Sequence, residues 1–175
     1  AWLLHANGWR PPSLRVHGTL VQPPLALQLP PLRRVFPAAT SVPLANPKGK
    51  WSLLYLAPAA CDAACVASLY GLRMAHIGQG EYSMRVQRLV IASDAPFAAQ
   101  LAAHDPGLLS LGTSARALAE LHRQLEPDAA ANALPAGAIY LLDPDARLVL
   151  RYPAGTDARG IRKDLARLLK HSSLG

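Results

Sequence analysis

Residues 51–65 read WSLLYLAPAACDAAC, and this stretch decides the fold. It opens on an apolar run, residues 51–57, which lies between a turn at 48–50 and Pro58. A short apolar run bounded by turn residues is typical of a strand that is buried on both faces. The stretch ends with Cys61 and Cys65, where an apolar pattern of helical spacing begins. The sequence therefore predicts a buried strand that leads directly into a helix, with both cysteines at the junction.

The predicted helix runs from Cys61 to about Ile77 and ends at Gly78 and Gly80. Its buried side is expected to hold Cys65, Val66, Leu69, Leu72 and Ile77. A second apolar strand is predicted over 86–92, and Asp94 followed by Pro96 predicts the cap of a helix over 97–103.

The second half continues the alternation of strands and helices. A short strand at 108–111 is followed by a helix, capped by Thr113 or Ser114, whose buried face holds Leu118, Leu121 and Leu125. The strands at 138–142 and 147–152 flank a turn at 143–146, which contains Asp143 and Asp145, and this pattern predicts a hairpin. The last helix, over 157–170, is expected to bury Ile161, Leu165, Leu168 and Leu169.

The N-terminal part differs in composition. Residues 1–50 hold nine of the 16 prolines, a density that excludes a long helix. Short extended pieces are predicted at 18–21, 25–29 and 41–44. We therefore expect residues 1–47 to form a Pro-rich arm that packs on a domain over 48–175. Trp2, Leu3 and Leu4 fit either the tail of a membrane span or a loose part of this arm.

The order of these elements predicts an α/β fold. After the arm it reads β-α-β-α-β-α-β-β-α, which is the thioredoxin arrangement: three layers, a mixed central sheet, and a C-terminal hairpin and helix. A chain of 175 residues, 51% hydrophobic and 17% charged, fits one globular domain and excludes a disordered one. Two cysteines also exclude a disulfide-dense scaffold.

The net charge of +7 has a simple explanation in a solvated basic surface. The chain has no block of five or six basic residues, so we expect no nucleic acid partner. The densest basic cluster lies on the last predicted helix, where it would face lipid headgroups if the protein is tethered. Its members are Arg159, Arg162, Lys163, Arg167 and Lys170.

The cysteine pair predicts redox or metal chemistry. On a helix, residues four apart share a face with Cβ atoms about 5–6 Å apart, which is close to disulfide range. A helix N-terminus also favours the thiolate, which is the attacking species in disulfide exchange and a soft ligand for Cu(I). The alternative is that Cys61 and Cys65 are two buried structural cysteines.

These motifs resemble the Sco/SenC family. The resemblance rests on residues 49–56 (GKWSLLYL), the cysteine pair, residues 141–144 (LLDP), residues 148–153 (LVLRYP) and residues 163–169 (KDLARLL). It implies a thioredoxin-fold protein of cytochrome c oxidase assembly. A shorter proteobacterial branch, with one N-terminal membrane span and an exported domain, is the more similar one. The resemblance thus implies the periplasmic side of the inner membrane, and a partner that is an oxidase subunit or another copper chaperone.

The chain departs from the Sco pattern at the metal ligands. Sco proteins bind copper through both cysteines and a histidine that would fall at or near Ala138, and no histidine lies between His122 and His171. Asp62 also stands where Sco proteins have a proline. Gly137 and Ala138 occupy the place of the thioredoxin cis-proline, and Pro135 comes two residues early.

The other histidines are poor substitutes for the missing ligand. His76 lies about four helical turns, roughly 22 Å, beyond Cys61. His76, His104 and His122 are therefore expected to be surface or capping residues, and His5 and His17 belong to the arm.

The sequence thus favours thiol–disulfide exchange, with Cys61 as the attacking thiolate and Cys65 as the resolving thiol. Cu(I) held by Cys61 and Cys65 alone is the second form of this hypothesis. Two alternatives stay open: a non-enzymatic scaffold that has lost the copper site, and a general periplasmic thiol–disulfide oxidoreductase. We expect a monomer.

Overall fold

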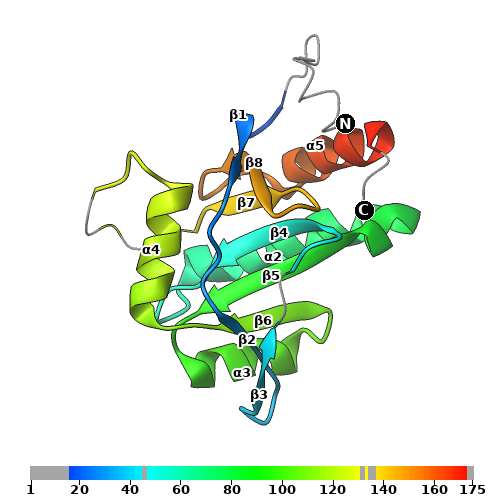
Figure 1. The fold of residues 1–175 in the computed structure, drawn as a ribbon. Helices are drawn as coiled ribbons and strands as arrows, with labels where there is room; N and C mark the ends of the chain where they lie inside the picture. Colours follow the sequence, from blue (N-terminus) through cyan, green and yellow to red (C-terminus); the bar gives the residue numbers. More distant parts are fainter. Residues whose placement is uncertain (1–15, 45–46, 131–132, 134–136, 173–175) are drawn as a thin grey trace.

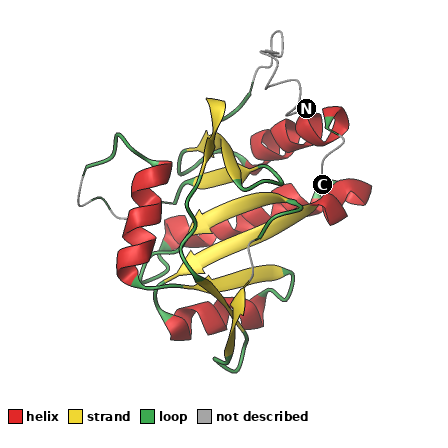
Figure 2. Cartoon of the chain, in the orientation of Figure 1, coloured by secondary structure: helices red, strands yellow, loops and turns green. Residues whose placement is uncertain are grey.

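The structure is a computed structural model that describes residues 16–44, 47–130, 133 and 137–172. Within these residues, eight strands form one sheet in the order β1-β8-β7-β4-β5-β6-β2-β3 (Figures 1 and 2). The strands are β1 Thr19–Ala26, β2 Leu32–Val35, β3 Ser41–Leu44, β4 Trp51–Leu56, β5 Val86–Ala92, β6 Leu108–Gly112, β7 Ile139–Leu142 and β8 Arg147–Tyr152. The helices are α2 Ala63–Ile77, η1 Gly80–Arg85 (a 3-10 helix), α3 Ala95–His104, α4 Ala115–Leu125 and α5 Ala158–His171.

The centre of the sheet is mixed, as predicted. Strand β4 runs parallel to β5, and β5 runs parallel to β6. On its other side β4 pairs with the antiparallel β7, and β7 forms the predicted hairpin with β8. All six side chains of β4 are buried, including Trp51, which agrees with an apolar run that faces helices on both sides.

Two layers of helices enclose the sheet, so the predicted three-layer fold is confirmed. Helices α2, α3 and α5 bury their apolar residues against one face, together with Trp51, Leu53 and Tyr55 of β4. Helix α4 covers the other face, where it packs Leu118, Leu121 and Leu125 against side chains such as Leu54 and Leu56. Figure 1 shows α4 in front of the sheet and α2 behind it.

The N-terminal segment adds strands to this sheet. Strand β1 pairs with β8 at one edge, while β2 pairs with β6 and forms a hairpin with the edge strand β3. The extended pieces predicted at 18–21 and 25–29 both overlap one strand, β1, which ends at Ala26 and whose register shifts between Leu20 and Leu25. Strand β2 was not predicted. The division of the chain at 47/48 stays a prediction.

Asp164 of α5 attaches this segment to the domain. Its fully buried carboxylate accepts hydrogen bonds from the backbone N–H groups of His17 and Gly18 and from the Tyr152 hydroxyl, and it contacts the His17 ring. Predictions for Trp2, Leu3, Leu4, His5 and Pro135 lie outside the described residues. Within the described part of the chain, every helix is too short or too polar to cross a membrane.

Candidate redox site

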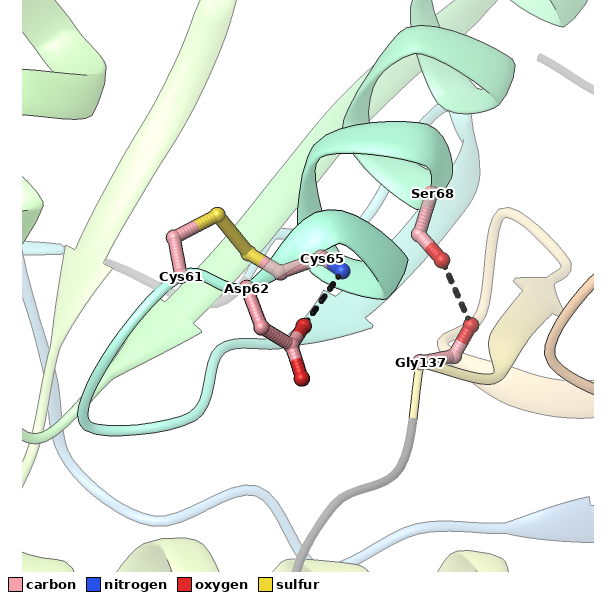
Figure 3. Close-up of a disulfide and its surroundings, with 5 residues drawn as sticks. All are labelled: Cys61, Asp62, Cys65, Ser68 and Gly137. Atoms are coloured by element: carbon pink, nitrogen blue, oxygen red, sulfur yellow. Dashed lines mark hydrogen bonds between the residues drawn. A yellow bond between two sulfur atoms is a disulfide. The ribbon is translucent and has the colours of Figure 1, made fainter.

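Cys61 and Cys65 form a disulfide where β4 leads into α2 (Figure 3). The two sulfurs are 2.12 Å apart and the two Cα atoms 5.1 Å apart. Because β4 and β5 are parallel, their carboxyl ends meet at this edge of the sheet. The antiparallel β7 begins at the same edge, since Ile139 is opposite Tyr55 near the end of β4.

Asp62 determines where the helix starts. It is the N-cap of α2, and its carboxylate accepts a hydrogen bond of 2.9 Å from the backbone N–H of Cys65. Cys65 therefore lies in the first turn, whereas Cys61 precedes the cap and lies outside the helix. The prediction that both cysteines share one helical face was wrong in this detail, because the chain turns at Asp62 to bring the sulfurs together.

The two sulfurs differ in exposure. Cys65 is 1% exposed and packs in the core under the helical layer, whereas Cys61 is only partly buried at the margin of that core. An incoming thiolate therefore reaches Cys61, and Cys65 is shielded by the domain. This difference agrees with the roles that we predicted for the two residues, which remain predictions.

The buried face of α2 is only in part the predicted one. Its buried residues are Cys65, Ser68, Gly71, Leu72 and Ala75. Val66 and Ile77, which we expected inside, are 60% and 52% exposed. Cys65 and Leu72 are buried as expected, and Leu69 packs against the core. The small residues Ser68, Gly71 and Ala75 complete the inner face and let the helix lie close to the sheet and to α5.

Ser68 connects α2 to the segment before β7. Its buried hydroxyl donates a hydrogen bond of 2.8 Å to the carbonyl of Gly137 (Figure 3). Gly137 has φ +79°, and a Cβ there would lie 3.3 Å from Ser68 Oγ and 4.0 Å from Ala64 Cβ. Glycine is favoured at this position because the backbone is left-handed and packs directly on the first turns of α2.

This arrangement decides on which face a third metal ligand could lie. Ala138 packs against the core on the α4 face, whereas both cysteines belong to the core on the opposite face. The position directed toward α2 is Gly137, which has no side chain. In the part of the chain that the structure describes, no group of three or more His, Cys, Asp or Glu residues could hold a metal ion. These residues do not fit a copper site of two cysteines and one histidine.

The candidate histidines have other places in the structure. His76 contacts the Ser83 carbonyl through Nε2 and accepts a hydrogen bond from Arg88 at Nδ1. His104 is exposed at the end of α3, as expected for a surface residue. His122 is buried inside α4, so the expectation of a surface or capping residue was wrong, and α4 lies across the sheet from the cysteines.

The electrostatics of the site centre on Asp62. Burial, together with the smaller effect of the nearby Asp62 carboxylate, raises the pKa of Tyr55 in β4 to about 12. The phenol is therefore neutral at physiological pH.

Asp94 caps α3 by accepting a hydrogen bond of 3.0 Å from Phe97 N–H, which confirms its predicted structural role.

The sheet order, the three layers and the cysteine pair after β4 define a thioredoxin-like protein. A family described as "Transmembrane-like, thioredoxin-like, C-terminal domain" matches residues 51–172, and the chain belongs to this family. No curated protein matches the chain.

Solved Sco structures share the fold. Yeast Sco1 is 19% identical with a TM-score of 0.64, over 87% of this chain and 98% of that one. Copper-bound ScoI from Arabidopsis thaliana is 17% identical with a TM-score of 0.62, over 82% of this chain and 98% of that one. BsSco, described as a Sco-family cytochrome c oxidase assembly protein with a disulfide switch, is 16% identical with a TM-score of 0.60, over 88% of this chain and all of that one. The Sco-like fold is thus established.

Proposed function

We propose that this chain is a thiol–disulfide exchange protein of cytochrome c oxidase assembly. The observation that carries the proposal is the Cys61–Cys65 disulfide at the start of α2, with Cys61 accessible and Cys65 buried. The Sco-like fold supports the same process, since BsSco is described as an assembly protein with a disulfide switch. We place the protein on the periplasmic side of the bacterial inner membrane, tethered by an N-terminal span.

The reaction needs only the two cysteines and a partner's cysteine pair. In the reduced protein, the Cys61 thiolate attacks a partner disulfide, forms a mixed disulfide and releases one partner thiolate. The Cys65 thiolate then attacks Cys61 Sγ, which restores the Cys61–Cys65 bond and releases the second partner thiolate. Two electrons pass to the partner, and the two protons lost by Cys61 and Cys65 are balanced by those that the released thiolates take up. The reverse sequence oxidises the partner.

Cu(I) binding is the second candidate, and it has less support. Two thiolates can hold Cu(I), and ScoI from Arabidopsis was solved with copper bound. The described residues provide no third ligand beside Cys61 and Cys65. Titrating the reduced protein with Cu(I) in competition with a chelator tests whether Cys61 and Cys65 bind copper. Tight stoichiometric binding that is lost in Cys61→Ala would contradict a purely redox role.

Partner trapping tests the proposal directly. In Cys65→Ser the resolving thiol is missing, so mixed disulfides formed at Cys61 should accumulate in cells and be identified by mass spectrometry. Cys61→Ser is the matched control and should trap nothing. Capture of an oxidase subunit or a copper chaperone supports the proposal. Capture of many unrelated exported proteins indicates a general oxidoreductase, and a pair that neither exchanges with dithiols nor binds copper indicates a scaffold.

A further inference from the structure

The outward face of α2 is unusually apolar. Eight large hydrophobic side chains are exposed among the described residues, and six of them lie between positions 66 and 84. Four belong to one side of α2: Val66, Tyr70, Met74 and Ile77. At about 1.5 Å per residue, this row extends roughly 16 Å along the helix. The row begins directly after Cys65, so it runs from the disulfide to the far end of α2.

Helix α5 lies beside this row and is basic. A Cβ on Gly71 of α2 would lie 3.8 Å from the Cβ of Ala158, and the Arg162 side chain lies against Gly78 at the end of α2. Gln79 also donates a hydrogen bond of 3.1 Å to the Arg162 carbonyl. The exposed basic residues of α5 are Arg159, Arg162, Lys163, Arg167 and Lys170.

The two helices expose no carboxylate. Residues 63–77 include no acid, and the single acid of residues 158–171 is the buried Asp164. The exposed acids nearby lie beyond the helix ends, at Asp62, Glu81 and Asp157, and Asp157 pairs with Arg159. We call the row on α2, with Arg73 and the basic residues of α5, the α2–α5 face. It joins an apolar strip to a strip of positive charge.

We propose that the α2–α5 face docks the protein that exchanges disulfides with Cys61, through an apolar segment that carries acidic side chains. This inference rests on the proposed function and adds the chemistry of its partner. Exposed apolar patches of this kind mark interaction sites, and complementary charge fixes orientation and speeds encounter. Because the row begins at Val66, directly after Cys65, a segment lying along it brings its own cysteine pair to the partly exposed Cys61.

Three synthetic dithiol peptides test the docking surface. All three peptides begin with the same cysteine pair. In the first it is followed by Leu and Glu at amphipathic helical spacing, in the second by Leu and Lys at that spacing, and in the third by Gly and Ser. The measurement is the rate at which each reduces Cys61–Cys65 in the whole chain. We expect the Leu/Glu peptide to react at least about tenfold faster than the others at low salt, and this advantage to shrink as ionic strength rises.

Variants assign the effect to the face. The triple change Val66→Ser, Tyr70→Ser and Met74→Ser should remove the advantage of the Leu/Glu peptide. Leu25→Ser with Val42→Ser is the matched control, because both residues are exposed and apolar but lie on β1 and β3. Arg73→Glu with Arg162→Glu should shift the preference toward the Leu/Lys peptide.

The outcomes separate this inference from the proposed function. Equal rates for the Leu/Glu and Gly/Ser peptides, or a triple variant that keeps the preference, would overturn the docking surface and leave the exchange chemistry in place. Failure of dithiothreitol and of every peptide to exchange with the pair would overturn the proposed function itself. The protein could instead bind vesicles of anionic phospholipid through these same residues and react with all three peptides at equal rates. That result would identify the face as a membrane-binding surface and overturn the inference.

Discussion

Ser68 Oγ donates a hydrogen bond to the Gly137 carbonyl across 2.8 Å, although the two residues are 69 positions apart in the sequence. The bond joins the second turn of α2, directly behind the disulfide, to the segment that enters β7 (Figure 3). It therefore holds the backbone at Gly137 against α2. Sequence patterns such as caps and turns, which involve near neighbours, do not specify this contact.

Replacing Ser68 tests how much this hydrogen bond contributes to the stability of the protein. Ser68→Ala leaves the Gly137 carbonyl buried without its partner, which should lower the free energy of unfolding by about 1–3 kcal/mol. Denaturant titration of the oxidised protein measures it. Ser93→Ala, at an exposed serine after β5, is the control and should change stability by less than about 0.5 kcal/mol. A Ser68→Ala variant as stable as the control would show that water replaces the bond.

Asp62 has two separable effects, on the helix and on the neighbouring thiol. Asp62→Ala removes the N-cap and should cost about 0.5–2 kcal/mol of stability, whereas Asp62→Asn keeps a capping side chain. In a Cys65→Ser background, Asp62→Asn should speed the alkylation of Cys61 by iodoacetamide several-fold, because it removes a negative charge that disfavours the thiolate. Equal alkylation rates with and without Asp62→Asn would show that the carboxylate does not act on Cys61.

A histidine placed at the position that the Sco pattern indicates should not create a copper site. Ala138→His directs the new imidazole toward the α4 face, away from Cys61 and Cys65, since adjacent residues in extended chain point to opposite faces. Competition of the reduced variant with a Cu(I) chelator should give an affinity within about threefold of wild type. A gain of tenfold or more would mean that this segment rearranges to present the ligand.

His76 predicts a specific pH dependence of stability. Burial lowers its pKa, and the nearby Arg88 acts in the same direction, while the hydrogen bond to Ser83 opposes them. The unfolded chain then takes up a proton at about pH 6.5, before the folded one does. The free energy of unfolding should thus be at its full value above about pH 6.5 and fall as the pH drops below it.

The control for this effect is His76→Gln, which keeps a donor and an acceptor but does not titrate. Unfolding free energies of both proteins, measured between pH 5 and 8 (roughly the range over which histidine changes charge), should differ by a constant amount above neutrality. The wild type should lose more than the variant as the pH falls. Parallel curves over the whole range would mean that His76 titrates alike in the folded and unfolded chains.

The sequence predicted the parts of the fold that are encoded by local pattern. The uninterrupted apolar run at 51–57 identified β4 as a buried strand, and the turn with Asp143 identified the β7–β8 hairpin. The cap at Asp94 was identified, and the cap of α4 was narrowed to Thr113 or Ser114, because capping depends on residues only three positions apart; the structure has Ser114. Strand β2 was missed, because four residues with two exposed or partly exposed arginines carry little apolar pattern.

For the site, sequence determined the cysteine pair and its place between a strand and a helix, because both follow from spacing. It could not determine which cysteine is the more exposed, since that depends on how closely α2 packs against the sheet and against α5. Nor could it give the Ser68–Gly137 contact or the apolar outer face of α2, because helical spacing alone does not say which side meets the sheet. Only the tertiary structure decided these points, through the small residues on the inner side of α2 that allow it to pack closely.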